Sequence, residues 1–249
     1  ETFAVFLLAL TAWGLAAGSI PPRRAAGAGA SAGLLALVRP SLILLGPLMA
    51  FVWAWGRSRG GCSPRTALAA FLAGWALFPA LWIARNAATP GVGPALTTKL
   101  GPDLYEGIGR TADGGPVTER IDWGSLGSWE SEGTRNRGIL GLACSEALSS
   151  PVRTLSLVPV KLRRFWNPFP NRPEWRRPAV CAGTAVAPLL WLPPALLWLR
   201  RGGGWRAGLL LAPAVYLTAL HCVFIASIRF RLPAEPFLAI AAACFFGAR

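Results

Sequence analysis

The chain has 249 residues, of which 53% are hydrophobic and only 14% are charged, and its formal net charge at pH 7 is +14. A soluble domain carries about 25% charged residues, so this composition excludes an ordinary soluble domain and indicates a membrane protein. The positive charge does not indicate nucleic-acid binding, because many of the arginines flank apolar runs, as membrane topology requires.

Residues 1–86 are expected to form the N-terminal transmembrane helices. Apolar runs cover residues 2–18, 25–38 and 41–55, and the run 25–38 is the shortest and richest in small residues. The run 2–18, at about 17 residues, is long enough to span a bilayer as a helix. The dipeptide Ser63-Pro64 has the form of an N-cap followed by a proline at the first helical position. It predicts a fourth helix that ends at Trp82, with Arg85 and Asn86 just beyond it.

Residues 87–177 have a different character and are expected to form an extracytoplasmic loop domain. Nine of the eleven acidic residues fall in this stretch. Residues 132–147 are predicted to be helical. Ser150-Pro151 then predicts the start of a second helix in the loop.

This second helix of the loop has a regular apolar stripe with cations beside it. Lys161 and Arg164 flank the stripe, whose members are Val152, Leu155, Val158, Leu162 and Phe165. One interpretation is a helix that lies in the membrane interface with its cations toward lipid phosphates. The other is a helix packed on the rest of the loop. Pro159 weakens either helix.

Residues 178–249 are expected to form the C-terminal transmembrane helices, from apolar runs at 178–199, 205–226 and 236–246. If every run crosses the membrane, the arginine-bearing connections at 23–24, 57–65 and 200–206 all lie on the cytoplasmic side, as the positive-inside rule requires. The predicted fold class is therefore an all-α membrane protein. It is a polytopic helical bundle of about seven membrane segments with one large extracytoplasmic loop.

The cysteines do not indicate a metal site or a disulfide framework. None of the five forms a Cys-x-x-Cys pair, and three lie in apolar runs, where cysteine behaves as a small hydrophobic residue. No His, Cys and Asp cluster has the spacing of metal ligands, so we expect neither a metal nor a cofactor. The chain begins at Glu1 inside an apolar segment, so we expect it to be the C-terminal part of a longer protein.

The strongest candidate site lies between the last two apolar runs, where Arg229, Arg231 and Glu235 are accompanied by two prolines. An arginine in mid-bilayer costs roughly 2.5–3.5 kcal/mol on insertion scales, so these arginines belong at a membrane edge or in a functional cavity. Guanidinium groups bind phosphate bidentately, which favours a lipid-linked phosphate or diphosphate as ligand. Arg85 and Asn86 are expected on the same side. The alternative is that the arginines are interface anchors.

A second candidate lies at residues 101–115, where several glycines surround Asp103, Tyr105 and Glu106. Glycines let a backbone approach a ligand closely, so this stretch predicts a compact ligand-binding loop. A plain surface turn is the alternative. His221, about two helical turns before Arg229, is expected to make a hydrogen bond between helices.

Several of these stretches resemble the dolichyl-phosphate-mannose-protein mannosyltransferases and their bacterial aminoarabinose-transferase-like relatives. Residues 33–40 (Gly-Leu-Leu-Ala-Leu-Val-Arg-Pro) and 81–86 (Leu-Trp-Ile-Ala-Arg-Asn) are similar to that family in order and content. In the family a Trp-x-x-Arg-Asn sequence closes the helix before a large periplasmic loop, and a Gly-x-Asn-Leu-Tyr-x-Gly-Asn-Asn stretch follows. Leu104, Tyr105 and Gly107 match that stretch, whereas Asp103 replaces an asparagine and residues 108–109 replace the paired asparagines.

Two further stretches carry the same resemblance. One is Lys161-Leu162 before Phe165-Trp166. The other is the ending that runs from His221 to Arg229-Phe-Arg231-Leu-Pro, with Phe230 where the family has tyrosine.

The resemblance implies a GT-C-type glycosyltransferase in the bacterial inner membrane. Such an enzyme moves a sugar from a polyprenyl-phosphate carrier to an acceptor lipid, glycan or protein at the outer face. By resemblance and charge, Arg229, Arg231 and Arg85 with its neighbour Asn86 would contact the carrier phosphate. Tyr105 and Asp103 would touch the sugar or order the loop. The acidic residues of the family lie in a first outer loop expected before Glu1, so no catalytic residue is nominated.

Two other functions stay open. A transporter or flippase for a lipid-linked substrate would also use buried charges and proline-broken helices. A non-catalytic membrane scaffold would use residues 87–177 to bind a partner.

Overall fold

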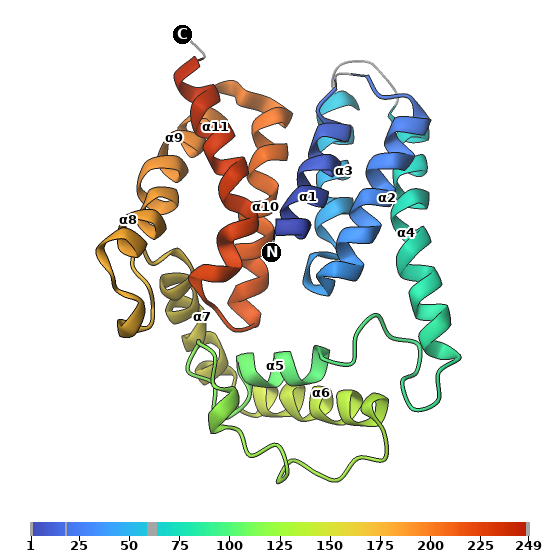
Figure 1. Cartoon of the computed structure of the whole chain (residues 1–249), viewed down its shortest axis with the longest axis vertical. Coiled ribbons are helices and arrows are strands. Elements are labelled where there is room, and N and C mark those ends of the chain that lie inside the picture. The colour runs from blue at the N-terminus through green and yellow to red at the C-terminus, as the bar shows by residue number, and fades with distance from the viewer. Residues whose placement is uncertain (1, 18, 59–63, 248–249) are drawn as a thin grey trace. The chain divides into compact units, whose positions relative to one another are not determined.

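The computed structural model describes residues 2–17, 19–58 and 64–247. Within these ranges every regular element is a helix and none is a strand (Figure 1). Three helical segments there are long and apolar enough to cross a membrane: Arg65–Ala87, Pro178–Val223, which is broken at Gly202 and Gly204, and Ile228–Gly247. The all-helical class is thereby confirmed, and the three helices indicate a membrane protein.

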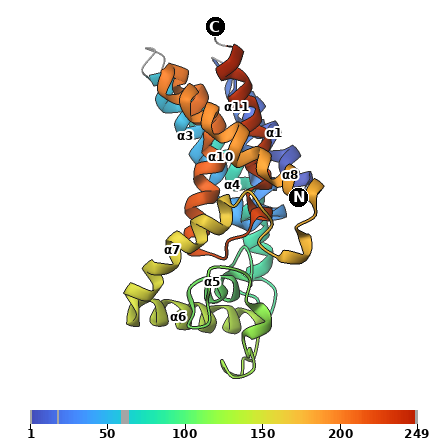
Figure 2. The ribbon, with the colours of Figure 1, turned by 90° about the vertical axis from the view of Figure 1, so that its left-hand side faces the viewer.

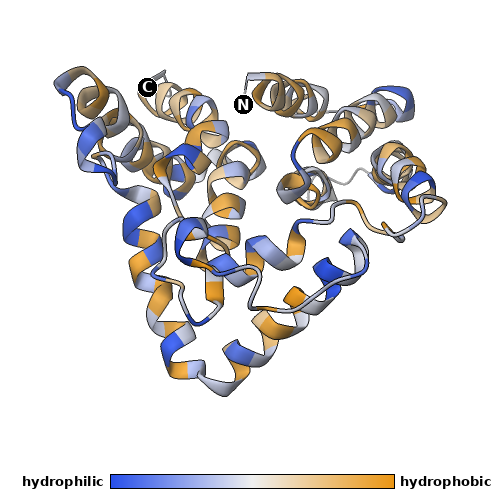
Figure 3. Cartoon of the chain, turned by 60° about the horizontal axis from the view of Figure 1, so that its bottom comes forward, coloured by the Kyte–Doolittle hydropathy of each residue, from blue (hydrophilic) through white to orange (hydrophobic). Residues whose placement is uncertain are grey.

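The chain divides into two compact units, and each is built from separated stretches. Unit 1 comprises Glu1–Trp82, Ala185–Tyr216 and Leu232–Arg249, and unit 2 comprises Ile83–Thr184 and Leu217–Arg231. Unit 2 thus includes residues 217–231, which the sequence analysis grouped with the C-terminal helices. Hydrophobic residues predominate along the helices that carry the two termini (Figure 3).

The N-terminal part of unit 1 contains four α-helices and one short 3₁₀ turn. These are α1 (Thr2–Leu15), α2 (Pro22–Val38), η1 (Pro40–Leu42), α3 (Leu45–Ser58) and α4 (Arg65–Ala87), whose last residues belong to unit 2. Small residues allow these helices to approach closely. A Cβ atom on Gly74 of α4 would lie 2.2 Å from the Ala26 carbonyl oxygen, and one on Gly33 of α2 would lie 2.5 Å from the Trp75 oxygen. Small residues at helix interfaces are typical of membrane helices.

Several helix boundaries differ from the sequence-based expectation. Helix α2 begins at Pro22, so Arg23 and Arg24 lie in its first turn instead of in a connection. Proline suits this position because its φ is already helical and its missing N–H would have no helical partner. Arg24 Nη2 donates to the Trp13 carbonyl at 2.8 Å, which holds the turn against α1.

The connection between α3 and α4 is shorter than expected. Helix α3 includes Arg57 in its last turn. The proposed cap Ser63 and Arg59 lie outside the described residues. Helix α4 continues to Ala87, so Arg85 and Asn86 lie in its last turn instead of beyond it.

The C-terminal part of unit 1 is interrupted by π-helical turns and by a glycine break. Its elements are η4 (Ala187–Trp191), α9 (Leu192–Trp198), η5 (Leu199–Gly203), the first part of α10 (Gly204–Val223), and α11 (Glu235–Gly247). Prolines at 188, 193 and 194 remove backbone donors, which explains the irregular hydrogen bonding. Gly202 and Gly204 take φ values of 95° and 58°, so the helical backbone stops there before α10 begins.

Unit 2 is organised around two helices that lie side by side, α5 (Leu100–Ile108) and α6 (Glu132–Ser149) (Figure 2). The predicted helix at 132–147 is confirmed as α6, and Ser131 and Thr134 form its capping box. The other elements are η2 (Thr118–Arg120), α7 (Pro151–Trp166), η3 (Pro173–Trp175), most of α8 (Pro178–Val186), and the start of η6 (Ile228–Ala234). The core consists of Leu104, Tyr105, Ile108, Val117, Ile121, Ile139 and Ala143.

The loop expected at residues 101–115 is helical over its first part. Residues 100–108 form α5 because Leu104, Tyr105 and Ile108 bury one face against α6. The glycines serve helix packing. A Cβ on Gly101 would lie 2.2 Å from the Asn136 carbonyl oxygen, and one on Gly107 would lie 2.7 Å from the Val223 oxygen.

Helix α7 begins as predicted, with Pro151 in its first turn, but Ser150 makes no side-chain cap. The expected apolar stripe is buried only in part, since its member Phe165 is 1% exposed. Val152 and Leu155 are 81% and 68% exposed, whereas Lys161 is 1% exposed. Of the two interpretations left open for this helix, the one that turns Lys161 toward lipid phosphates is wrong, because its ammonium group bonds inside unit 2.

Candidate functional site

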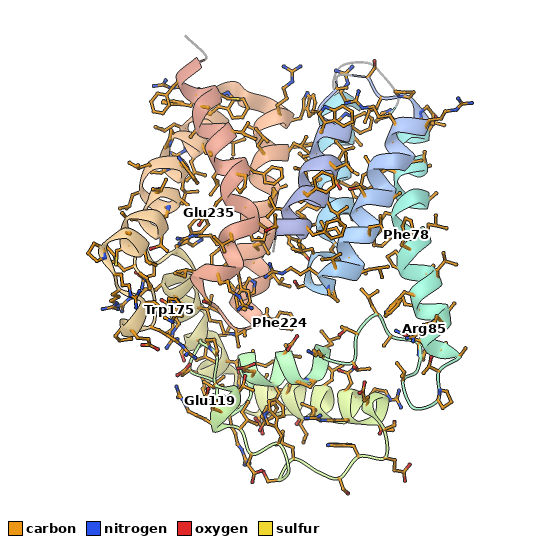
Figure 4. All side chains as sticks on the ribbon, viewed as in Figure 1. Phe78, Arg85, Glu119, Trp175, Phe224 and Glu235 are labelled. Atoms are coloured by element: carbon orange, nitrogen blue, oxygen red, sulfur yellow. The ribbon has the colours of Figure 1, made fainter. Side chains whose placement is uncertain are left out.

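All six residues expected to bind substrate lie in unit 2, although more than half of the chain separates the first from the last. They are Arg85, Asn86, Asp103, Tyr105, Arg229 and Arg231. Glu235, the acidic residue of the same C-terminal stretch, belongs to unit 1. Arg85 lies in the last turn of α4 and Phe224 in the stretch 217–231 (Figure 4).

Residues 217–231 are attached to the rest of unit 2 by close backbone contacts. Ala226 N donates to the Gly114 carbonyl at 3.1 Å. Gly107 of α5 lies directly against the backbone of Val223 and Phe224, where a side chain would not fit. The stretch that contains Tyr105 and the stretch that contains the two arginines are therefore neighbours in space.

Arg231 is completely buried, and its guanidinium donates hydrogen bonds to three backbone carbonyls. Its Nη1 donates to the carbonyls of Phe165 and Asn167 at 3.0 and 3.1 Å, and its Nη2 donates to the Thr184 carbonyl at 2.6 Å. The first two acceptors are at the C-terminal end of α7, where helical carbonyls lack partners and the helix dipole attracts a cation. Arg231 therefore links α7 to α8. A phosphate group could contact its guanidinium only after the residues that bury it had moved.

Arg229, two residues earlier, is exposed. Its guanidinium carbon lies 5.6 Å from the ring centroid of Phe230. Phe230 stacks on His221 with centroids 4.6 Å apart, and His221 stacks on Phe165 at 5.5 Å. The hydrogen-bond partner found for His221 Nδ1 is the Ile225 carbonyl at 2.5 Å, within the same stretch of chain. The three rings give Arg229 a rigid base while leaving it open to solvent.

Arg85 and Asn86 have different environments although they are adjacent. Asn86 is 5% exposed, and its Nδ2 donates to the Ala95 carbonyl at 2.8 Å, which organises the chain after α4. Arg85 is exposed, and its Nη1 donates to Asn86 Oδ1 at 2.9 Å. Asn86 therefore holds the chain after α4 in place, while Arg85 presents a cation at the surface.

Tyr105 is buried, with 1% of its surface exposed, and its hydroxyl donates to Glu146 Oε1 at 3.1 Å. Burial and the neighbouring Glu146 carboxylate raise the pKa of Tyr105. Glu146 also accepts a hydrogen bond from the Arg110 backbone N–H. Of the two roles expected for Tyr105, ordering the loop fits this geometry.

Asp103 lies on the exposed side of α5. Partial burial of its carboxyl group, together with the charge of Glu106, raises the pKa of Asp103, while Lys99 acts in the opposite direction. Asp103 is thus an accessible carboxyl group within the stretch that resembles the glycosyltransferase motif.

Glu106, named in the sequence analysis together with Asp103 and Tyr105, is a buried residue with a structural role. It is 7% exposed and accepts hydrogen bonds from the backbone N–H groups of Val117 and Thr118, each at 2.8 Å. It therefore fixes the chain after α5.

Lys161, which one interpretation of the sequence placed toward lipid phosphates, is also buried inside unit 2. Its Nζ donates to the Cys222 carbonyl at 3.2 Å and to the Val223 carbonyl at 2.5 Å. Burial lowers the pKa of Lys161 to about 8, although Cys222 acts in the opposite direction. Lysine occurs only at positions 99 and 161, a rarity that marked this residue in the sequence.

An acidic residue at the edge of unit 2 holds two arginines. Asp113 Oδ2 lies 2.9 Å from Arg120 Nη2, and Asp113 Oδ1 lies 3.8 Å from Arg164 Nη2. Burial alone would raise the pKa of Asp113, but the Gly115 backbone hydrogen bond and the two arginines together lower it. Arg164, expected to face lipid phosphates, instead contacts this carboxylate.

Among the described residues no group of three or more His, Cys, Asp or Glu side chains is arranged to hold a metal ion. No protein-family model, no curated protein and no solved structure matches the chain. The function must therefore be inferred from the chain's own residues.

Proposed function

We propose that the chain is part of a bacterial inner-membrane glycosyltransferase. It would transfer a sugar from a polyprenyl-phosphate carrier to an acceptor lipid, glycan or protein at the outer face. The observation that carries the proposal is that unit 2 contains the stretches at 85–86, 103–107, 161–166 and 221–231, which in sequence resemble one glycosyltransferase family.

The proposal includes a polytopic bundle of about seven membrane segments with residues 87–177 on the extracytoplasmic side. Three long apolar helices, together with the shorter apolar helix Thr2–Leu15, support a multi-pass arrangement. The arginine-bearing connections support its orientation.

Within this proposal the exposed and the buried cations have different tasks. Arg229 and Arg85 are exposed and would contact the carrier phosphate, whose negative charge increases as the bond to the sugar breaks. Arg231 is buried and would act as a positioning residue. Asp103 would accept hydrogen bonds from sugar hydroxyls. The carboxylate that deprotonates the acceptor is not assigned to any residue of this chain.

The test is transfer of a radiolabelled sugar from a polyprenyl-phosphate donor by membranes that contain the full-length protein. Arg229→Ala should lower kcat/KM by about 100-fold, because a charge-assisted contact to a phosphate is lost. Arg229→Lys should retain part of the activity, since the charge stays and the bidentate geometry is lost. Arg177→Ala, at another exposed arginine of unit 2, is the control and should leave transfer unchanged.

Two results would contradict the proposal. One is an absence of transfer by the parent protein together with translocation of the donor lipid in liposomes, which would indicate a transporter. The other is equal transfer by the parent and by Arg229→Ala, which would remove Arg229 from the site.

A further inference from the structure

Helix α7 has its polar side turned into unit 2. Arg153 Nη2 donates to the carbonyls of Gly109 and Ala112 at 2.7 and 3.1 Å, and Lys161 donates to carbonyls of α10. Arg164 lies beside Asp113. Three of the four cations of this helix are therefore engaged inside the unit, and only Arg163 lies on the exposed side.

The opposite side of α7 is exposed and mainly apolar, with Ser156 and Arg163 as its polar members. Val152, Leu155 and Val160 are 81%, 68% and 40% exposed, and Pro159 lies among them. Leu148, at the end of α6, adds a further 81% exposed side chain next to this face. A helix on the surface of a soluble protein has the reverse arrangement, with its apolar stripe inside and its charges outside.

We propose that the outer face of α7, formed by Val152, Leu155, Pro159 and Val160, lies in the interface of the lipid bilayer that the chain's own apolar helices enter. The proposal does not depend on glycosyl transfer. It differs from the interfacial helix expected from the sequence, because the apolar side chains contact lipid while Lys161 and Arg164 bond inside the protein.

The position of the second half of α7 beside α10 supports lipid as the neighbour of this face. The second half of α7 packs on residues 217–223, which end the candidate membrane span Pro178–Val223. Trp166 Nε1 donates to Thr218 Oγ1 at 3.2 Å, and Phe165 stacks on His221. Because a spanning helix ends at the edge of the hydrocarbon layer, the second half of α7 lies at that edge.

The residues at the end of α7 and just beyond it suit the same location. Arg163 is exposed at the end of the apolar face, where it can reach lipid phosphates. Phe169 and Trp175, in the connection to α8, are 50% and 61% exposed. Exposed aromatic rings beside cations are typical of membrane interfaces.

Fluorescence quenching in vesicles tests the proposal. The five cysteines are replaced by serine, and Leu155→Cys and, separately, Glu130→Cys are labelled with bimane. The protein is then reconstituted in phosphatidylethanolamine and phosphatidylglycerol vesicles that contain doxyl lipid. We expect doxyl lipid to quench the label at position 155 at least about threefold more than the label at position 130, and aqueous iodide to do the reverse. Val152→Cys should behave like Leu155→Cys.

Quenching of position 155 by iodide alone would overturn the proposal, since the face would then be in water. Protection from both quenchers would also overturn it, since another protein surface would then cover the face. A photoreactive benzoylphenylalanine at Leu155 in the chain with its native cysteines gives a second measurement that needs no cysteine replacement. A lipid adduct supports the proposal, whereas an adduct of two chains, or no lipid adduct, contradicts it.

Discussion

Arg231 and Lys161 are buried cations of unit 2 that bond to carbonyl groups at helix ends. Arg231 binds the end of α7, and Lys161 binds the end of α10. The last four carbonyls of a helix have no partner within the helix, and a buried charge must be hydrogen-bonded. Each cation therefore satisfies acceptors that would otherwise be buried without donors.

Arg231→Ala should destabilise the protein strongly, because the carbonyls of Phe165, Asn167 and Thr184 would lose their donor. Loss of several buried hydrogen bonds to a charged group is worth about 3 kcal/mol of unfolding free energy. Arg229→Ala is the matched control, and it should leave the unfolding midpoint in detergent nearly unchanged because Arg229 is exposed. Equal unfolding midpoints for the two variants would contradict the positioning role of Arg231.

Lys161 predicts a rise of stability with pH. Its pKa is about 8 in the folded chain and 10.5 when unperturbed, so between these values the unfolded chain binds more protons. The penalty for burying the charged ammonium is complete below about pH 8 and is relieved as the pH rises toward 10.5.

Comparison with Lys161→Met isolates this titration from those of other groups. Between pH 7.5 and pH 9.5 the unfolding free energy of the parent should rise relative to that of the variant by about 1–2 kcal/mol. The measurement is denaturant unfolding in detergent at both pH values. A pH-independent difference between the two proteins would show that Lys161 does not titrate in this range.

At the scale of elements, glycines decide how closely the helices approach. Gly107 brings α5 against the backbone of residues 223–224, and Gly101 brings it against α6. In unit 1, Gly33 and Gly74 do the same for α2 and α4. In each case the nearest neighbour is backbone, which cannot move aside as a flexible side chain can.

Gly107→Ala should therefore separate α5 from residues 217–231. The added Cβ would lie 2.7 Å from the Val223 carbonyl oxygen and 2.9 Å from Phe224 Cα, and such overpacking costs about 1–3 kcal/mol. Gly141→Ala in α6 is the control. No atom lies within 4 Å of its added Cβ, and alanine is the better helix former by about 0.5–1 kcal/mol. The thermal unfolding midpoint should fall for Gly107→Ala and rise for Gly141→Ala. A shift of both midpoints in the same direction would argue against the close contact of Gly107 with residues 223–224.

The same glycines explain where the sequence misleads. Helix α6 was predicted at residues 132–147, close to its bounds, and the start of α7 was predicted from Ser150-Pro151. Helix α5 was not, because Gly101 and Gly107 favour a loop until the surfaces they contact are known. The burial of Lys161 in α7 was also not predicted, because its partners are backbone carbonyls, and a pattern of side chains does not indicate backbone partners.

The candidate site was predictable in residue type but not in exposure. Arg229 and Arg231 are two residues apart and look equivalent in the sequence, yet one is exposed and the other has no exposed surface. A 3₁₀ turn places residues two apart on different sides. Which side faces inward depends on α7 and α8, whose contact with this turn is set by the tertiary fold.

At the scale of the whole molecule, the proposed seven-segment arrangement makes a labelling prediction. In a chain whose cysteines are replaced by serine, Glu130→Cys and Arg200→Cys place single thiols at exposed positions. A membrane-impermeant maleimide should label position 130 in intact spheroplasts and position 200 only after permeabilisation, since the two lie on opposite sides in the proposed topology. Labelling of both positions in intact cells would contradict that topology.

The bonds of Arg231 also dictate an order of events during synthesis. Residues 83–184 leave the ribosome well before residue 231. Until Arg231 has been translated, the carbonyls of Phe165, Asn167 and Thr184 therefore lack this hydrogen-bond donor. Unit 2 therefore closes only after α10 has been made. A nascent chain arrested ahead of α10 should keep this region open to proteases, and one extended past Arg231 should protect it.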